Sequence, residues 1–239
     1  MYKIAGLKVK MECSGETLLA QGEPYRTAVA GQPDMIIDIS DETLAKTKES
    51  YPQFCFDEWE YIHKGFAFSY KLLEHSGFCL HASAVAMGNK AVLFSAPCGT
   101  GKSTHAGLWQ QYFGKDKVVI INDDRPALRL LGDEIYVYGT QWSGKTNLNA
   151  NIKVPLQAVV FLKQAGENHI ERLTNKEAIK RLIRHSIRPN HDKGKMDALL
   201  TLLDTLLQKT PVYHLDCNIS MDAVKLAYDT INKRMRCII

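Results

Sequence analysis

The sequence of 239 residues predicts an α/β protein with a mixed sheet, and two observations lead to this fold class. Short apolar runs typical of strands recur along the chain, and they alternate with longer segments whose apolar residues have helical spacing. A glycine-rich segment also lies between an apolar run and a helical segment, which is the order strand, loop, helix. We expect an N-terminal α/β region over residues 1–77, packed on a second domain over residues 78–239.

The N-terminal region begins with alternating apolar and polar residues, which predict a strand over residues 2–11. A second short apolar run covers residues 35–39. Asp41 is the expected cap of a short helix that reaches about Lys48. A longer helix is expected to start near Asp57, and Gly77 would end the region.

The second domain is expected to contain most of the strands. They are predicted over residues 78–87, 91–95, 118–121, 127–131, 135–138, 156–162 and 169–173. Turn signals at Gly88 and Gly132 predict two hairpins, and the last two strands are also expected to pair antiparallel. Three helices should close the chain, of which the first begins with a Thr174–Glu177 capping box and the third is capped by Ser220.

The strongest motif is APCGTGKS at residues 96–103. Its two glycines leave the backbone free to turn successive N–H groups toward a phosphate, the lysine adds a positive charge, and the serine can bind magnesium. The helix expected over residues 104–112 would direct its positive N-terminus to the same anion. Ala96 stands where the consensus has its first glycine. The expected phosphate-binding residues are Cys98, Gly99, Thr100, Gly101, Lys102, Ser103 and Thr104.

Two further groups of residues are candidates for a catalytic or metal-binding role. Asp123 and Asp124 follow the apolar run 118–121, and successive side chains on extended backbone point to opposite sides. We therefore expect one to hold magnesium and the other to accept a proton, although an Asp-Asp turn before Pro126 would need neither role. His81 precedes Ala96 by a hairpin that would return it near the phosphate, and a packed strand histidine is the alternative.

In this order, the runs LHASAV, APCGTGKS and NDD resemble the P-loop proteins of the HPr kinase/phosphorylase and phosphoenolpyruvate carboxykinase type. The resemblance covers residues 78–131 and, more weakly, the remainder of the chain. It implies the P-loop fold of the HPr kinase C-terminal domain, here with an N-terminal α/β extension. Carboxykinases are much longer than this chain, whereas residues 78–239 match the size of an HPr kinase catalytic domain.

The same resemblance implies a role for each of the candidate site residues. Lys102 would bind the β- and γ-phosphates of ATP, and Ser103 would bind magnesium. The Asp123/Asp124 pair would supply metal binding and the catalytic base, with His81 nearby. Cys98 replaces a serine frequent in HPr kinases, and neither this change nor Ala96 removes a charge that the chemistry needs.

These features predict a Mg-ATP-dependent kinase that moves a γ-phosphoryl group to a hydroxyl, such as a serine of a small protein or peptide. Asp123 would be the base and Asp124 the magnesium ligand, an order that could be reversed. The alternatives are a small-molecule kinase or carboxykinase-like enzyme, and a nucleotide-binding regulatory protein without turnover. Residues 139–149, with an exposed Trp142 and the cation Lys145, are the candidate for acceptor recognition; a plain surface connection is the other interpretation.

The composition of the chain limits the kinds of binding partner that we expect. The net charge of +4 without a basic run does not favour nucleic acid binding. The N-terminus lacks the apolar centre of a signal peptide, and no run of about 18 apolar residues occurs, so we expect a cytoplasmic protein that does not bind membranes. The six scattered cysteines, Cys237 among them, are expected to stay reduced. The HPr kinase resemblance also admits a homo-oligomer.

Overall fold

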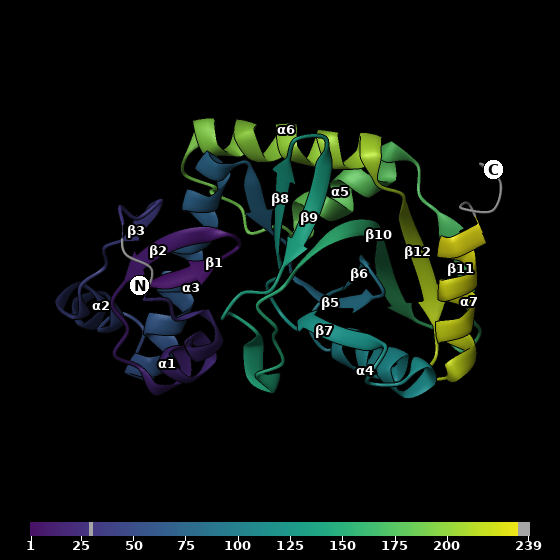
Figure 1. Ribbon diagram of the computed structural model, residues 1–239, viewed down its shortest axis with the longest axis horizontal. Helices are drawn as coiled ribbons and strands as arrows, with labels where there is room; N and C mark the ends of the chain where they lie inside the picture. The colour runs from purple at the N-terminus through teal and green to yellow at the C-terminus, as the bar shows by residue number, and fades with distance from the viewer. Residues whose placement is uncertain (29–30, 234–239) are drawn as a thin grey trace.

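The computed structural model describes residues 1–28 and 31–233 and has mixed α/β architecture (Figure 1). The strands are β1 (Tyr2–Ile4), β2 (Leu7–Met11), β3 (Met35–Ile37), β4 (Gly77–Cys79), β5 (Ala82–Met87), β6 (Lys90–Ser95), β7 (Val118–Asn122), β8 (Ala127–Leu131), β9 (Glu134–Tyr138), β10 (Lys153–Gln164), β11 (His169–Arg172) and β12 (Val212–Cys217). The α-helices are α1 (Glu16–Gly22), α2 (Asp41–Lys48), α3 (Phe56–Leu72), α4 (Lys102–Phe113), α5 (Asn175–His185), α6 (Lys193–Lys209) and α7 (Met221–Lys233).

A large mixed sheet forms the centre of the molecule. Its strand order is β4-β8-β9-β10-β6-β5-β7, with β12 beside β10 and β11 beside β12. The long strand β10 belongs to both halves of this sheet, because its first residues pair antiparallel with β9 and its later residues pair parallel with β6. A register shift between Leu156 and Ala158 marks the change of partner, and the sheet curls there (Figure 1).

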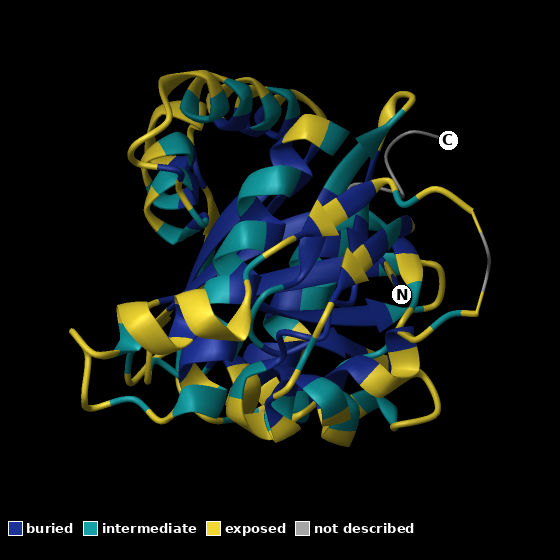
Figure 2. Ribbon diagram, turned by 90° about the vertical axis from the view of Figure 1, so that its left-hand side faces the viewer, coloured by how far each residue is buried: buried dark blue, intermediate teal, exposed yellow. Residues whose placement is uncertain are grey.

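Alternating side chains along the central strands separate two cores. Leu93 and Val159 face one side, where they belong to a cluster with leucines of α5 and α6. Phe94, the next residue of β6, faces the opposite side and packs with Trp109 of α4 and Val224 of α7. Strand segments buried on both faces are continuous apolar runs, as residues 91–94 of β6 and 158–162 of β10 are. Figure 2 shows these strands in the buried interior, with exposed residues on the outer faces of the helices.

The N-terminal region forms a smaller sheet, β1-β2-β3, with α1, α2 and α3 around it. Its core is shared with the large sheet, because Phe68 of α3 belongs to the same buried cluster as Tyr138 and Trp142. Arg129 of β8 also donates from Nη1 to the carbonyl oxygen of Ala5 at 2.9 Å. The region therefore packs directly against the strands that lead toward residues 139–149.

Two runs that the sequence predicts as single strands each contribute to two strands in the structure. The run 2–11 forms a hairpin, since Ala5 and Gly6 adopt positive φ angles of 51° and 76° and reverse the chain. The run 78–87 becomes β4, which pairs with β8, and β5, which pairs with β6 and β7. Because the two segments have different partners, the strand is interrupted between them at Leu80 and His81.

The prediction that the strands at 156–162 and 169–173 pair with each other is wrong. Strand β12, which the apolar pattern did not reveal, lies between β10 and β11; it runs parallel to the first and antiparallel to the second. Helix α1 was also not expected, and Ser40 rather than Asp41 caps α2, since its Oγ accepts the N–H of Thr43. The β5–β6 and β8–β9 hairpins and the Thr174 capping box of α5 are confirmed.

In the part of the chain that the structure describes, no helix combines the length and apolar character needed to cross a membrane. The five cysteines of that part are free thiols: Cys13, Cys55, Cys79, Cys98 and Cys217. Cys237 lies outside the described residues.

Candidate phosphate-binding site

The strand directions bring the three sequence motifs to one edge of the large sheet. Strand β5 runs antiparallel to both β6 and β7, so the start of β5 lies at the same edge as the ends of its two neighbours. His81 precedes β5, the glycine-rich loop 96–101 follows β6, and Asp123 and Asp124 follow β7. Segments separated by some 40 residues therefore meet because of sheet topology.

A cavity of about 320 Å³ lies at this edge. It is lined by His81, Cys98, Gly99, Gly101, Lys102, Ser103, Thr104, Asp123, Asp124, Ser143, Gly144, Lys145 and Thr146. Of the residues expected to form the site, Thr100 alone does not line this cavity; it borders a second cavity on the other side of the loop. The turn 143–146 is an additional wall of the site.

The loop has the backbone that an anion needs. Gly99 and Gly101 have φ angles of 77° and 100°, a region in which side-chain-bearing residues are strained. The N-cap residue of α4 is Gly101, which has no side chain to cap the helix, so the first N–H groups of α4 remain available to an anion. The Lys102 ammonium lies folded against the loop and donates to the carbonyl oxygens of Ala96 at 3.1 Å and Pro97 at 3.4 Å. Burial lowers the pKa of this lysine, and the nearby Asp124 partly opposes that shift.

The two aspartates have different surroundings. Asp123 is buried, and its Oδ1 accepts a hydrogen bond from Ser83 Oγ at 2.5 Å. Asp124 is more accessible; its Oδ1 lies 3.4 Å from Nε2 of His81 and its Oδ2 lies 3.4 Å from Nε of Arg125. Burial raises the pKa of Asp124, with Arg125 and Lys102 acting in the opposite direction.

Asn122 holds this pair in place. Its Oδ1 accepts the N–H groups of Asp124 at 3.0 Å and Arg125 at 2.7 Å, which forms an Asx turn after the strand. Its Nδ2 donates to the carbonyl oxygen of Thr140 at 2.8 Å. The amide thus connects the acidic turn to the start of the segment that carries the turn 143–146.

His81 lies at the break between β4 and β5 rather than on a strand. Its main chain is held on both sides, because its N–H donates to His185 O and its carbonyl accepts from Ser95 Oγ, both at 2.8 Å. Burial lowers the pKa of His81 to about 4, with contributions from the positive charges of Lys102 and Arg125. The imidazole beside Asp124 is therefore neutral at pH 7 and acts as a hydrogen-bonding group.

The expectation of an exposed Trp142 is wrong. Its side chain is 1% exposed, stacks on Phe68 with ring centroids 4.8 Å apart, and donates from Nε1 to the carbonyl oxygen of Tyr61. The polar segment around Trp142 does not indicate this burial, because the helix that covers the indole, α3, is distant in the sequence. In the same segment, Lys145 is exposed and lines the cavity.

A second cavity, of about 550 Å³, lies on the other side of the loop and was not expected from the sequence. Besides loop residues, it is lined by Phe161, Leu162, Lys163, Arg181, Arg184, His185 and His214. Arg181 Nη1 lies 2.8 Å from Nδ1 of His214. The spacing of the two arginines, three residues apart on α5, places them on one helix face and was the available signal. This cavity is suited to an anionic group that continues past the loop.

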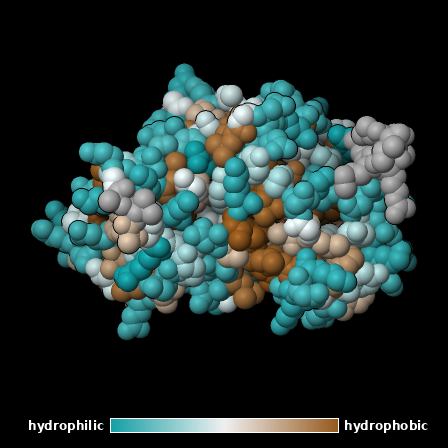
Figure 3. All heavy atoms as spheres, in the orientation of Figure 1, coloured by the Kyte–Doolittle hydropathy of each residue, from teal (hydrophilic) through white to brown (hydrophobic). Residues whose placement is uncertain are grey.

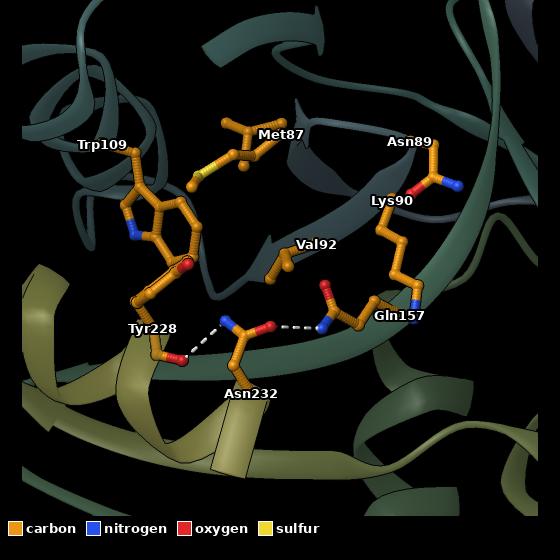
Figure 4. A pocket seen from close by; sticks show the side chains of 9 residues that line it. Met87, Asn89, Lys90, Val92, Trp109, Gln157, Tyr228 and Asn232 are labelled. Carbon is orange, nitrogen blue, oxygen red and sulfur yellow. Dashed lines mark hydrogen bonds between the residues drawn. The ribbon is translucent and has the colours of Figure 1, made fainter. Parts of the chain in front are cut away.

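A smaller cavity of about 150 Å³ lies at the opposite edge of the sheet, by the β5–β6 hairpin (Figure 4). Met87, Val92 and Trp109 form its apolar wall, while Asn232 is occupied by hydrogen bonds with Gln157 Nε2 and the carbonyl of Tyr228. Among the described residues that line it, none is a carboxylate or a histidine. Figure 3 shows apolar residues over the middle of the face seen in Figure 1, and these offer no chemistry either.

The oxygen donors of the site fit magnesium. Mg²⁺ prefers hard oxygen ligands and is commonly held by one or two carboxylates together with substrate phosphates. The cavity supplies the Ser103 hydroxyl and the carboxylates of Asp123 and Asp124. Within residues 1–28 and 31–233, no group of three or more His, Cys, Asp or Glu side chains could hold a metal by itself. A magnesium ion here would therefore depend on nucleotide phosphates as additional ligands.

No protein-family model matches the chain, and no curated protein matches it. Among solved structures, the chain is similar to the HPr(Ser) kinase/phosphatase from Coxiella burnetii, with a TM-score of 0.36 and 10% sequence identity. The aligned part covers 66% of this chain and 97% of that structure. A similarity at this level assigns no residue role.

Proposed function

We propose that the protein is a Mg²⁺-dependent phosphotransferase that moves the γ-phosphoryl group of ATP to a hydroxyl group. The observation that carries the proposal is one cavity lined by the glycine-rich loop, its lysine and serine, two aspartates and a neutral histidine. Phosphoryl transfer needs little covalent chemistry from a protein and depends on phosphate positioning, charge neutralisation and a group that orients the acceptor. The cavity contains a residue of the required kind for each of these tasks.

The loop N–H groups and Lys102 would bind the β- and γ-phosphates, and the lysine would exchange its two loop carbonyls for phosphate oxygens. Ser103 and Asp123 would hold magnesium, which neutralises charge on those phosphates. Asp124 would accept the proton of the acceptor hydroxyl. We prefer this order because Asp123 is buried and held by Ser83, whereas Asp124 is more accessible and lies beside the turn past which an acceptor would enter.

The direct test incubates the protein with γ-labelled ATP and cell extract and then separates proteins from small molecules. Label on a protein or peptide supports a protein kinase, and label on small molecules supports a metabolite kinase. ATP binding without label in either fraction would instead support a nucleotide-binding regulatory protein.

The rest of the nucleotide would extend from the loop into the arginine-lined cavity, with Arg184 near the phosphates. Arg184→Ala is expected to raise the Kd of ATP about tenfold, since a hydrogen bond to a charged group contributes roughly 1.5 kcal/mol. Lys176→Ala removes a charge from the same helix outside the cavity and should leave the Kd unchanged. Isothermal titration of both variants checks this, and equal affinities would place the nucleoside elsewhere.

His81→Gln is expected to reduce turnover on the order of 10²-fold, because the glutamine amide cannot place its N–H groups where the imidazole nitrogen lies beside Asp124. The Kd of ATP should change far less, and the free energy of unfolding should fall by only about 1 kcal/mol. His191→Gln, at an exposed position, is the matched control. Turnover, ATP affinity and melting temperature are measured together. Normal turnover with only a lower melting temperature would make His81 a packing residue.

A further inference from the structure

Another cavity, of about 460 Å³, adjoins the phosphate-binding site across the turn 143–146. It lies between α1, α3 and this turn, and Gly144 and Lys145 line both cavities. We call it the α1–α3 groove; its other lining residues are Thr17, Gln21, Phe54, Asp57, Glu58, Tyr61 and Ile62. The groove is thus built mainly by the N-terminal region.

The turn between the two cavities is held firmly. Gln21 donates from Nε2 to the carbonyl oxygen of Gly144 at 3.0 Å, and the N–H of Gly144 donates to Tyr61 Oη at 2.9 Å. Ser143 Oγ lies 2.9 Å from Gln21 Oε1. Gly144 has a φ of 70°, and a Cβ built on it would lie 3.1 Å from Cβ of Asp124. One face of the turn therefore closes the groove, while the other packs on the proposed proton acceptor.

The groove has an apolar wall and an acidic end. Phe54 and Ile62 are half-buried and supply the apolar surface together with the ring of Tyr61. Asp57 accepts hydrogen bonds from the N–H and Oγ1 of Thr17, and Glu58 accepts the N–H of Cys55. In the part of the chain that the structure describes, neither carboxylate forms an ion pair with a cationic side chain. Their negative charges are therefore available to a ligand.

We propose that the α1–α3 groove binds the acceptor, and that the acceptor is a peptide segment with an apolar and a cationic residue next to its phosphorylated hydroxyl. The inference rests on the proposed function, since the hydroxyl must reach Asp124. The apolar side chain would pack on Phe54 and Ile62. The cationic side chain would lie near Asp57 and Glu58, away from the positive charge of Lys145 at the junction.

The test measures binding, so that it does not depend on turnover. A degenerate library of peptides with one central serine is applied to the immobilised full-length protein with Mg²⁺ and the β,γ-imido analogue of ATP. Bound peptides are sequenced. We expect enrichment of peptides that carry both an apolar and a cationic residue on the same side of the serine.

The double variant Asp57→Asn/Glu58→Gln removes both charges and keeps one side-chain oxygen acceptor at each position, one for Thr17 and one for the helix cap. The preference for a cationic residue should fall by about fivefold or more, as expected for losing two partly exposed charge pairs, while the apolar preference remains. Asp197→Asn/Asp204→Asn removes the same charge from exposed positions of α6 and should retain both preferences. Melting temperatures verify that the variants fold.

Two results would overturn the groove as the acceptor site: no enrichment with the wild-type protein, or the same cationic preference in the double variant. Label transfer from ATP to a small hydroxyl compound with no peptide enrichment would refute this inference and leave the proposed function standing. Peptide enrichment without ATP binding would refute the proposed function and would leave the α1–α3 groove as a peptide-binding site that has no phosphoryl acceptor role.

Discussion

Lys102→Ala is expected to lower phosphoryl transfer by about 10³-fold or more, to the background of the assay. Lys102 is the cation in the cavity that contacts the loop carbonyls directly, so its removal deprives the transferred phosphoryl group of its nearest compensating charge. Turnover with labelled ATP and the Kd of ATP are measured on the same preparation. The Kd should rise as well, because the lysine binds the ground-state phosphates too.

The fold should survive this change. Lys102 is 7% exposed, and burying an ammonium has a cost, so its loss is expected to change the free energy of unfolding by only about 1 kcal/mol. Lys115→Ala, at an exposed position after α4, is the matched control and should keep full turnover. Undiminished transfer by a folded Lys102→Ala protein would eliminate the phosphotransferase assignment.

Asp124→Asn and Asp123→Asn are expected to fail in different ways. If Asp124 accepts the hydroxyl proton, the Asp124→Asn variant should have a turnover about 10³-fold lower. Added Mg²⁺ should restore none of the lost rate. If Asp123 helps to hold magnesium, the Asp123→Asn variant should need a higher Mg²⁺ concentration for half-maximal turnover. Excess Mg²⁺ should then recover part of the rate. Titrating Mg²⁺ against turnover for both variants separates the two roles.

Ser83→Ala is the companion variant for this pair. It removes the hydrogen bond to Asp123 Oδ1 without altering a charge, so a modest change in the Mg²⁺ requirement is expected with little change in the maximal rate. If Asp123→Asn is the variant that Mg²⁺ cannot restore, the two aspartates have the opposite order. If both variants retain full turnover, the Asn122–Asp124 segment is only a turn.

Local pattern was enough to predict the parts of the fold whose partners are close in sequence. The β5–β6 and β8–β9 hairpins follow from turn residues between apolar runs, and α5 follows from a capping box and one apolar face. It was not enough for β12, because a strand inserted between β10 and β11 depends on long-range pairing. For the same reason, the break at His81 appears only when β4 and β5 have their separate partners.

The amino-acid sequence by itself determined the residue types on which the proposed chemistry at residues 96–104 and 122–124 depends, since a glycine-rich loop, a lysine, a serine and paired aspartates are defined by residue type and spacing. The tertiary structure decided which other side chains join them. Helix α5 places Arg184, and a turn held by Gln21 and Tyr61 places Lys145, in cavities that the loop also lines, and α3 buries the indole of Trp142. These placements depend on packing between elements more than 60 residues apart, and no local periodicity encodes such contacts.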